Sequence, residues 1–254
     1  MNFDVGCVSL PLESQHFSVF PGSGHVKWSA ALIRKGQVTL DRNATLLLKA
    51  VMGKKSAAEA AKTRKLIVST ARALFAELGF AGATTSRIAK TAGLTEGAFF
   101  HHFKDKKALF AEVVKNLQRE FAYEVVLRGR EGTNALERFM IGTRASIELS
   151  QKPEYLRLVL IEAPTVLGGS NWREIDAITS LSVIEPALAA IAGREDIEIR
   201  QIRPMALLTL GLLTETAFAL VRSDGTITVD DVIEVLEMSI SNWLKRVQPK
   251  SEAK

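Results

Sequence analysis

The sequence predicts an all-α protein, in which a small three-helix unit is followed by a larger bundle of helices. Apolar side chains recur at spacings of three and four from residue 62 onward, as they do on one face of an α-helix. No segment shows the sustained alternation of apolar and polar residues that marks a half-buried strand. The chain has 254 residues, of which 47% are hydrophobic, so it is long enough to bury a substantial core.

The N-terminal part of the chain has a different pattern. Residues 1–51 contain scattered prolines, glycines and single aromatic residues, and they follow no period of 2 or 3.6 residues. We therefore expect residues 1–55 to form a poorly structured extension. One hypothesis is that Met52 is the true start and that residues 1–51 come from a misassigned upstream start. A genuine extension, disordered or strand-forming, is the alternative.

Three helices are predicted in the segment that follows. The first has an apolar face over residues 66–78 and ends at Gly79, a residue type common just after a helix C-terminus. The second begins at Thr84 or Thr85 and ends at Ala92, before Gly93, and the third covers residues 96–102. Threonines stand at the start of both and can cap free backbone N–H groups with their hydroxyls.

A glycine-containing turn between the second and third of these helices indicates a helix-turn-helix unit. Ala89, Ala92 and Gly93 are small enough to let the two helices cross closely, and Phe99 and Phe103 can fill the core behind them. In such a unit the third helix enters the major groove of DNA, while the second crosses the phosphate backbone.

The charge of the chain is unevenly distributed. Residues 52–110 carry 11 basic and 4 acidic side chains, whereas residues 111–254 carry 17 basic and 21 acidic ones. A basic segment on a mildly acidic body fits a protein of which one part meets a polyanion. Cys7 is the only cysteine, which fits a reducing cytoplasm. The longest apolar stretch, residues 205–221, is interrupted by Glu215 and predicts a buried helix rather than a membrane span.

The segment from Thr84 to Lys106, TTSRIAKTAGLTEGAFFHHFKDK, resembles the signature of the TetR/AcrR family of transcriptional regulators. The resemblance implies a helix-turn-helix DNA-binding domain at residues 56–112 and a helical effector-binding and dimerisation domain at residues 113–250. It further implies a cytoplasmic, non-enzymatic, ligand-responsive repressor that binds a palindromic double-stranded operator as a homodimer. The alternative is a helical ligand-binding or protein-interaction module without operator recognition.

The resemblance also implies which positions contact DNA. They are Thr84, Thr85, Thr95, Glu96, Gly97, Ala98, Phe100, His101 and Lys106. Thr84 or Thr85 would bind a phosphate at a helix N-terminus, and Lys106 would anchor another. Phe100 stands where the family usually has tyrosine, so the hydroxyl that reaches a phosphate is missing. Glu96 would be repelled by phosphates unless it accepts a hydrogen bond from a cytosine amino group.

The second domain is expected to hold an unknown small, apolar effector in a cavity near the helix break at Pro164 and residues 168–169. The candidate lining residues are Phe139, Tyr155, Leu158, Val166 and Trp172. For each of them, ordinary core packing is the alternative. No histidine or cysteine follows residue 102, so we expect no imidazole or thiol catalysis, no metal and no cofactor there.

Two long helices, residues 200–222 and 229–247, are predicted to close the chain and to form a four-helix dimer interface. The residues assigned to that face are Leu208, Leu212, Glu215, Ala219, Val232, Leu236, Ile240, Trp243 and Leu244. The alternative is a pair of helices buried within one subunit.

Overall fold

The computed structural model describes residues 31–34, 37–40, 42–193, 197–222 and 226–247, with side chains from residue 57 onward. The chain divides into two compact units, Met1–Thr63 and Arg64–Lys254, which are described separately.

The first unit contains a two-stranded antiparallel sheet, β1 (Ala31–Arg34) and β2 (Gln37–Leu40), and the beginning of helix α1 (Arg42–Gly82). The expectation that residues 1–55 lack regular structure therefore does not match residues 31–34, 37–40 and 42–55, while residues 1–30 lie outside the described residues. Four-residue strands are too short to display a period of 2, and three consecutive leucines at 46–48 hide a helical period. The start at Met52 stays a prediction.

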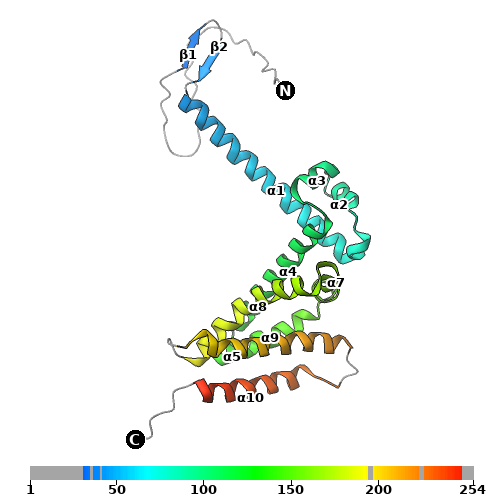
Figure 1. Ribbon diagram of the computed structural model, residues 1–254, viewed down its shortest axis with the longest axis vertical. Helices are drawn as coiled ribbons and strands as arrows, with labels where there is room; N and C mark the ends of the chain where they lie inside the picture. Colours follow the sequence, from blue (N-terminus) through cyan, green and yellow to red (C-terminus); the bar gives the residue numbers. More distant parts are fainter. Residues whose placement is uncertain (1–30, 35–36, 41, 194–196, 223–225, 248–254) are drawn as a thin grey trace. The chain divides into compact units, whose positions relative to one another are not determined.

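In the second unit, the described residues form helices and turns with no strand among them, which confirms the predicted all-α class (Figure 1). After α1 come α2 (Thr85–Thr91), α3 (Glu96–His102), α4 (Lys106–Gly129), α5 (Ala135–Ser150), α6 (Pro153–Tyr155), the π-helix η1 (Leu156–Glu162), α7 (Ala163–Leu167), α8 (Gly169–Ala192), α9 (Ile199–Arg222) and α10 (Val229–Val247).

Side-chain caps explain where several of these helices begin. The side-chain oxygens of Thr84, Thr95 and Asp105 accept hydrogen bonds from backbone N–H groups at the third position of α2, α3 and α4, respectively. A free N–H at a helix N-terminus is costly unless it finds such a partner. The predicted helix break at Gly79 is also present, because this residue has φ 73° and ψ 173° inside α1.

Two hydrophobic cores hold the second unit together. The first joins α1, α2, α3 and α4 to residues of α6, η1, α7, α8 and α9. In it the fully buried Phe75 meets Phe110 edge to face with 5.1 Å between ring centroids. Phe99 and Phe103 are buried here, which confirms that they fill the core behind the helix-turn-helix. Aromatic pairs in this geometry add roughly 0.5–1.5 kcal/mol to the area they bury.

The second core is built by α5, α8, α9 and α10, and it corrects the predicted dimer face. Val232, Leu236 and Ile240 on the inner side of α10 are buried within their own subunit. The exposed apolar residues of α10 are instead Val235 and Met238. An α-helix with two apolar stripes packs one inward and leaves the other outside, and periodicity alone did not distinguish the two stripes.

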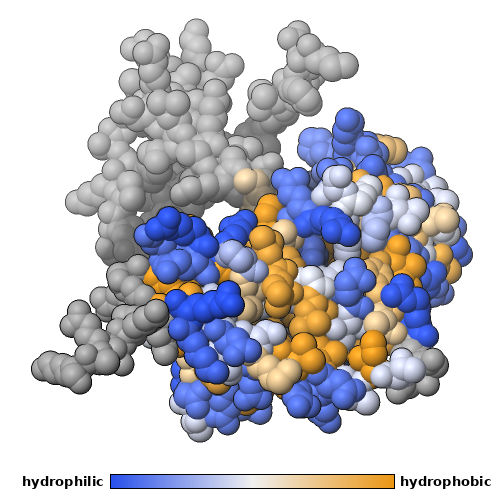
Figure 2. Space-filling view, turned by 60° about the horizontal axis from the view of Figure 1, so that its bottom comes forward, coloured by the Kyte–Doolittle hydropathy of each residue, from blue (hydrophilic) through white to orange (hydrophobic). Residues whose placement is uncertain are grey.

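By length and composition alone, α8 and α9 could each cross a membrane. Both pack against each other and against α5, and both line the same cavity, which are the contacts of core helices in a bundle. On the face of the second unit that Figure 2 shows, apolar side chains gather in patches among hydrophilic ones.

Candidate DNA-binding head and ligand cavity

The helix-turn-helix lies in what we call the head, residues 64–103. A tight turn joins α2 to α3: Gly93 has φ 69°, and the N–H of Leu94 donates to the carbonyl of Ala89 at 2.9 Å. The positive φ is one that glycine adopts at little cost. Buried Phe99 then fixes α3 on one side, which leaves its opposite side outward.

The outward side of α3 begins with the turn that would read base edges. Thr95, Glu96 and Gly97 are exposed, and Ala98 is half-buried. A Cβ at Gly97 would meet only the Thr95 hydroxyl, at 3.9 Å, so the space over this backbone is open. A groove of DNA can therefore approach the α3 backbone closely.

The far end of α1 is held by an arginine–glutamate pair from η1. Arg157 Nη1 donates to the carbonyls of Ala76 and Glu77 at 2.9 and 3.2 Å, and Glu162 Oε2 accepts from the N–H of Phe80 at 2.7 Å. The two side chains also bond to each other at 3.1 Å. These bonds satisfy backbone groups that the helix break at Gly79 leaves without partners.

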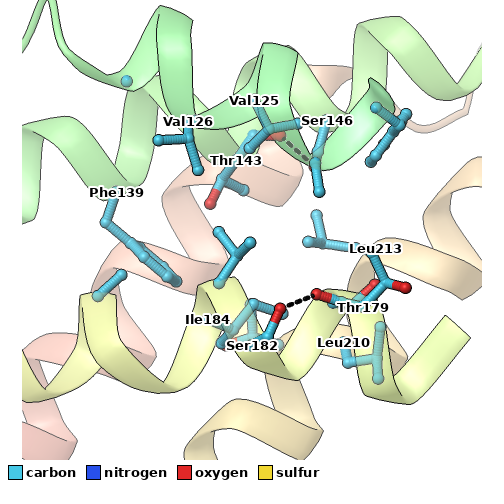
Figure 3. A pocket seen from close by; sticks show the side chains of 18 of the residues that line it. Val125, Val126, Phe139, Thr143, Ser146, Thr179, Ser182, Ile184, Leu210 and Leu213 are labelled. Atoms are coloured by element: carbon cyan, nitrogen blue, oxygen red, sulfur yellow. Dashed lines mark hydrogen bonds between the residues drawn. The ribbon is translucent and has the colours of Figure 1, made fainter. Parts of the chain in front are cut away.

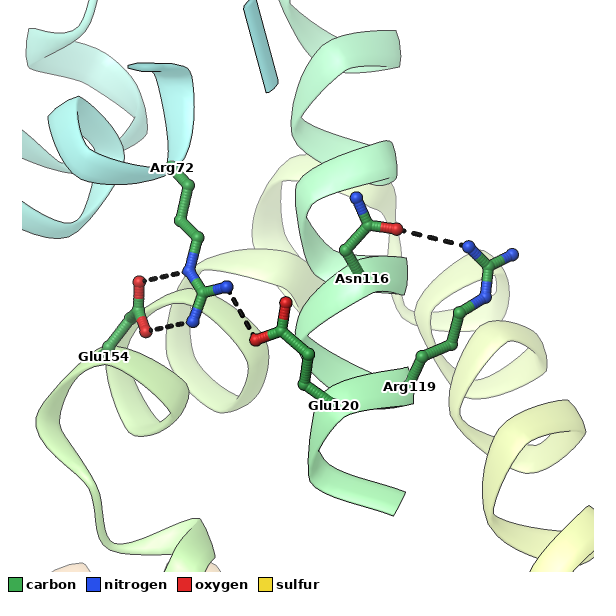
Figure 4. Close-up of polar contacts among 5 residues, drawn as sticks. All are labelled: Arg72, Asn116, Arg119, Glu120 and Glu154. Atoms are coloured by element: carbon green, nitrogen blue, oxygen red, sulfur yellow. Dashed lines mark hydrogen bonds and ion pairs between the residues drawn. The ribbon is translucent and has the colours of Figure 1, made fainter. Parts of the chain in front are cut away.

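A second ion cluster ties α1 to the bundle (Figure 4). Arg72 donates through Nε and Nη2 to both carboxylate oxygens of Glu154, at 2.8 Å each, and through Nη1 to Glu120 at 2.6 Å. The hydrogen bond from Arg72 lowers the pKa of Glu154 below its ordinary value, against the opposing effect of burial. Such a bidentate pair fixes orientation as well as distance.

The bundle encloses a cavity of about 510 Å³, lined by residues of α4, α5, α8 and α9 together with Tyr155 and Leu160. Most of the wall is apolar, and Figure 3 shows Val126, Phe139 and Ile184 around the hollow. A cavity of this size and character suits a small organic ligand.

One part of the cavity wall is polar and consists of buried Gln118 with the half-buried Asp176 and Ser180. Gln118 Nε2 donates to Asp176 Oδ1 at 3.2 Å, and the Ser180 hydroxyl bonds to the same oxygen at 3.3 Å. Burial raises the pKa of the Asp176 carboxyl, and burial together with Asp176 raises that of the Tyr155 hydroxyl. The other amide atom, Gln118 Oε1, is buried without a hydrogen-bond partner in the described part of the chain.

Two family models match the chain: bacterial regulatory proteins of the tetR family at residues 67–113, and the tetracyclin repressor-like C-terminal domain at residues 136–242. Between them they cover the helix-turn-helix and the bundle. The chain belongs to the TetR family. It is accordingly a DNA-binding transcriptional regulator and not an enzyme.

Individual proteins of known name or structure match this chain over different parts of its length. The repressor AcnR of Corynebacterium jeikeium is 29% identical over 195 residues, which are 74% of this chain and 97% of AcnR. AcrR of Shigella flexneri is 44% identical over 62 residues, and the chain spans only 29% of its length. A TetR-family regulator from Pectobacterium atrosepticum has a solved structure with a TM-score of 0.56 and 27% identity, covering 76% of this chain and 97% of that one.

Most of the positions that the resemblance implies for DNA contact are exposed, while Thr85, Ala98 and Lys106 are half-buried. Thr84 is exposed and caps α2, and Phe100 and His101 follow the leading turn on the exposed side of α3. Lys106, expected to bind a phosphate, here donates to the Phe80 carbonyl at 2.7 Å and lies 4.3 Å over the Phe80 ring. An ammonium has three donors, so this bond leaves capacity for a phosphate.

The predicted ligand residues divide into two groups. Phe139 and Tyr155 line the cavity, whereas Leu158, Val166 and Trp172 lie outside its lining. These last three pack in or against the first core. Closeness to the break at 164–169 predicts a place in the cavity wall, but the cavity is lined mainly by α4, α5, α8 and α9.

The structure also adds functional candidates that the sequence did not indicate. In the cavity these are polar residues set within apolar helix faces, Gln118 and Asp176 foremost. In the head they are the exposed basic side chains Arg87, Lys90 and Lys104, for which the basic balance of residues 52–110 was the available signal.

Proposed function

We propose that this TetR-family chain is a ligand-responsive repressor that binds a near-palindromic operator as a homodimer. The observation that carries the proposal is the open space over Gly97 at the start of α3. We assign DNA binding to residues 56–112, and effector binding and dimerisation to residues 113–250. Such a repressor acts in the cytoplasm, where the chromosome lies.

The dimer is expected to form through the outward stripes of the last two helices. Leu207 and Leu208 on α9, with Val235 and Met238 on α10, are each about half exposed although they are large and apolar. A two-fold axis pairs such a face with its own copy. It would also present two heads to half-sites about one helical turn, ~34 Å, or a multiple of it, apart.

The link between ligand and DNA is expected to run through residues 153–162. Tyr155 and Leu160 of this segment line the cavity, and Arg157 and Glu162 of the same segment hold the end of α1. A ligand that favours one arrangement of the segment then favours one position of the head. The ligand shifts the equilibrium between the two states, and the ratio of its affinities for them sets the size of the shift.

The test is fluorescence anisotropy with labelled DNA from the intergenic region upstream of the chain's own gene and random DNA of equal length, over a range of salt concentrations. We expect tighter binding to the intergenic DNA, with affinity falling as salt rises. Lys106→Ala should weaken binding to both DNAs and reduce the salt slope, whereas Glu96→Gln should change the preference between them.

The matched control is Lys245→Ala, which removes an exposed lysine from α10 and should leave both affinities unchanged. Equal, salt-insensitive binding to both DNAs would contradict operator recognition and favour a protein-interaction module. An unchanged salt slope in Lys106→Ala would remove Lys106 from the phosphate contacts.

A further inference from the structure

The polar part of the cavity wall contains an acceptor without a donor among the described residues, Gln118 Oε1. Gln118 is only 2% exposed, lines the cavity and leaves its Oε1 without a partner. A buried carbonyl oxygen left unpaired is costly, and a ligand group that donates to it removes that cost. Asp176 beside it receives hydrogen bonds from Gln118 and Ser180. Among the ion pairs of the described residues, none includes Asp176.

An aromatic wall stands next to these acceptors. Tyr155 stacks on Phe121 with 4.4 Å between ring centroids, and both rings line the cavity. Asp176 lines the same cavity as these two rings. Aromatic faces attract cations, and the attraction grows when the cation has left water.

The basic residues of the cavity lie elsewhere. Arg130 and Arg138 also line it, but both are exposed. Arg130 is twelve residues beyond Gln118 in the chain, where α4 ends, about 18 Å along the helix axis. Their charges are solvated and need no counterion from a ligand, whereas the half-buried Asp176 carboxylate would gain from one.

We propose that the cavity binds an amphipathic amine, whose ammonium group occupies the acceptor site of Gln118 and Asp176 and whose apolar body fills the remainder. An ammonium supplies several N–H donors and one positive charge, so it can serve both the unpaired amide oxygen and the carboxylate. A neutral alcohol can supply only one donor and no charge. A carboxylate would meet two acceptors and a like charge. This inference rests on the proposed effector role of the same cavity.

The test uses three probes with one apolar chain and different ends: n-octylamine, n-octanol and octanoate. Their binding to the full chain is measured by isothermal titration calorimetry. The expected order of affinity is amine, then alcohol, then carboxylate. Asp176→Asn should weaken amine binding at least tenfold while changing alcohol binding little, since the amide keeps the shape of the site. The matched control Glu174→Gln, an exposed carboxylate on the same helix, should leave all three unchanged.

Octanoate binding as tightly as the amine, equal amine affinity in Asp176→Asn and the unaltered chain, or no binding by any probe would each overturn the proposal. Unchanged n-octanol binding in Asp176→Asn reports an intact cavity, so loss of amine binding is separable from misfolding. The anisotropy assay tests the regulator role independently. Operator binding without amine binding refutes the ligand class alone, and amine binding without operator binding refutes the proposed repressor.

Discussion

Gly79→Ala should destabilise the second unit more than any other conservative change at a positive-φ glycine of the head. Gly79 has φ 73° and ψ 173°, a region that is essentially restricted to glycine and that costs other residues about 1–3 kcal/mol. A Cβ built there would lie 2.6 Å from Arg157 Nη2 and 2.7 Å from Glu162 Oε1. Both side-chain ends are hydrogen-bonded to the backbone of α1, so neither can withdraw without losing those bonds.

The expected magnitude follows from these two contributions. Displacing the Arg157–Glu162 pair forfeits one or two hydrogen bonds to charged groups, each worth about 1.5–3 kcal/mol. Backbone strain and the loss of one such bond together give a loss of roughly 2.5–6 kcal/mol in the free energy of unfolding. For a chain of this size the melting temperature should then fall by about 5–24 °C, measured by far-ultraviolet circular dichroism.

The control is Gly93→Ala, which has a similar φ of 69° but no atom within 4 Å of its built Cβ. Gly93→Ala introduces backbone strain alone, so its melting temperature should lie closer to that of the unaltered chain. The double variant Gly79→Ala with Arg157→Ala should lose less than the sum of the two single losses, because the second change removes the atom that the new Cβ meets. Equal melting temperatures for the two alanine variants, or strict additivity, would refute the reasoning.

Three further predictions concern charge, DNA and assembly. Arg72 lowers the pKa of Glu154, so the ion pair stabilises the fold at pH values above the ordinary glutamate pKa of about 4.3. This stability is lost as the pH falls through the lowered pKa of Glu154. In Glu154→Gln, the melting temperature should therefore fall less steeply toward acid pH than in the unaltered chain. Phe100→Tyr places a hydroxyl on an exposed position of α3 and should tighten binding to all DNA sequences about fivefold, or ~1 kcal/mol, in anisotropy; an unchanged affinity would show that residue 100 does not face a phosphate. Met238→Asp should convert the dimer to monomers in sedimentation experiments, whereas Ser170→Asp, at an exposed position of α8, should not; a Met238→Asp dimer would exclude this face of α10 from the interface.

The head was largely predictable from the sequence, because its structure depends on local chemistry. Of the two threonines expected to cap α2, Thr84 does so, Thr95 caps α3 as expected, and Phe99 and Phe103 fill the expected core. Each of these features involves residues a few positions apart, where side-chain size and hydrogen-bonding capacity leave few solutions. The engagement of Lys106 by the Phe80 carbonyl was not predictable, since it depends on how α4 meets the end of α1.

The last helices were predicted in extent but not in orientation. Residues 229–247 form α10 as expected, yet Leu236 and Ile240 point into the subunit while Met238 points out. Periodicity predicts which apolar residues share a face of a helix, but it does not predict whether that face packs within the subunit or against a partner. When a helix has two apolar stripes, only the tertiary packing decides which one remains for a partner.

The cavity lies furthest from what sequence reasoning can reach, for a physical reason. Gln118 and Asp176 are 58 positions apart and come from α4 and α8, and each is a polar residue within a mostly apolar helix face. In sequence such a residue is indistinguishable from one that turns to solvent at the edge of the face. The role of such a residue can be recognised only in a structure in which the helices surround a cavity. A polar group that faces a filled core must have a hydrogen-bond partner within that core, whereas one that faces a cavity can be paired by a ligand. The unpaired Oε1 of Gln118 is therefore the kind of feature that identifies a binding site in a structure and leaves no trace in the order of residues.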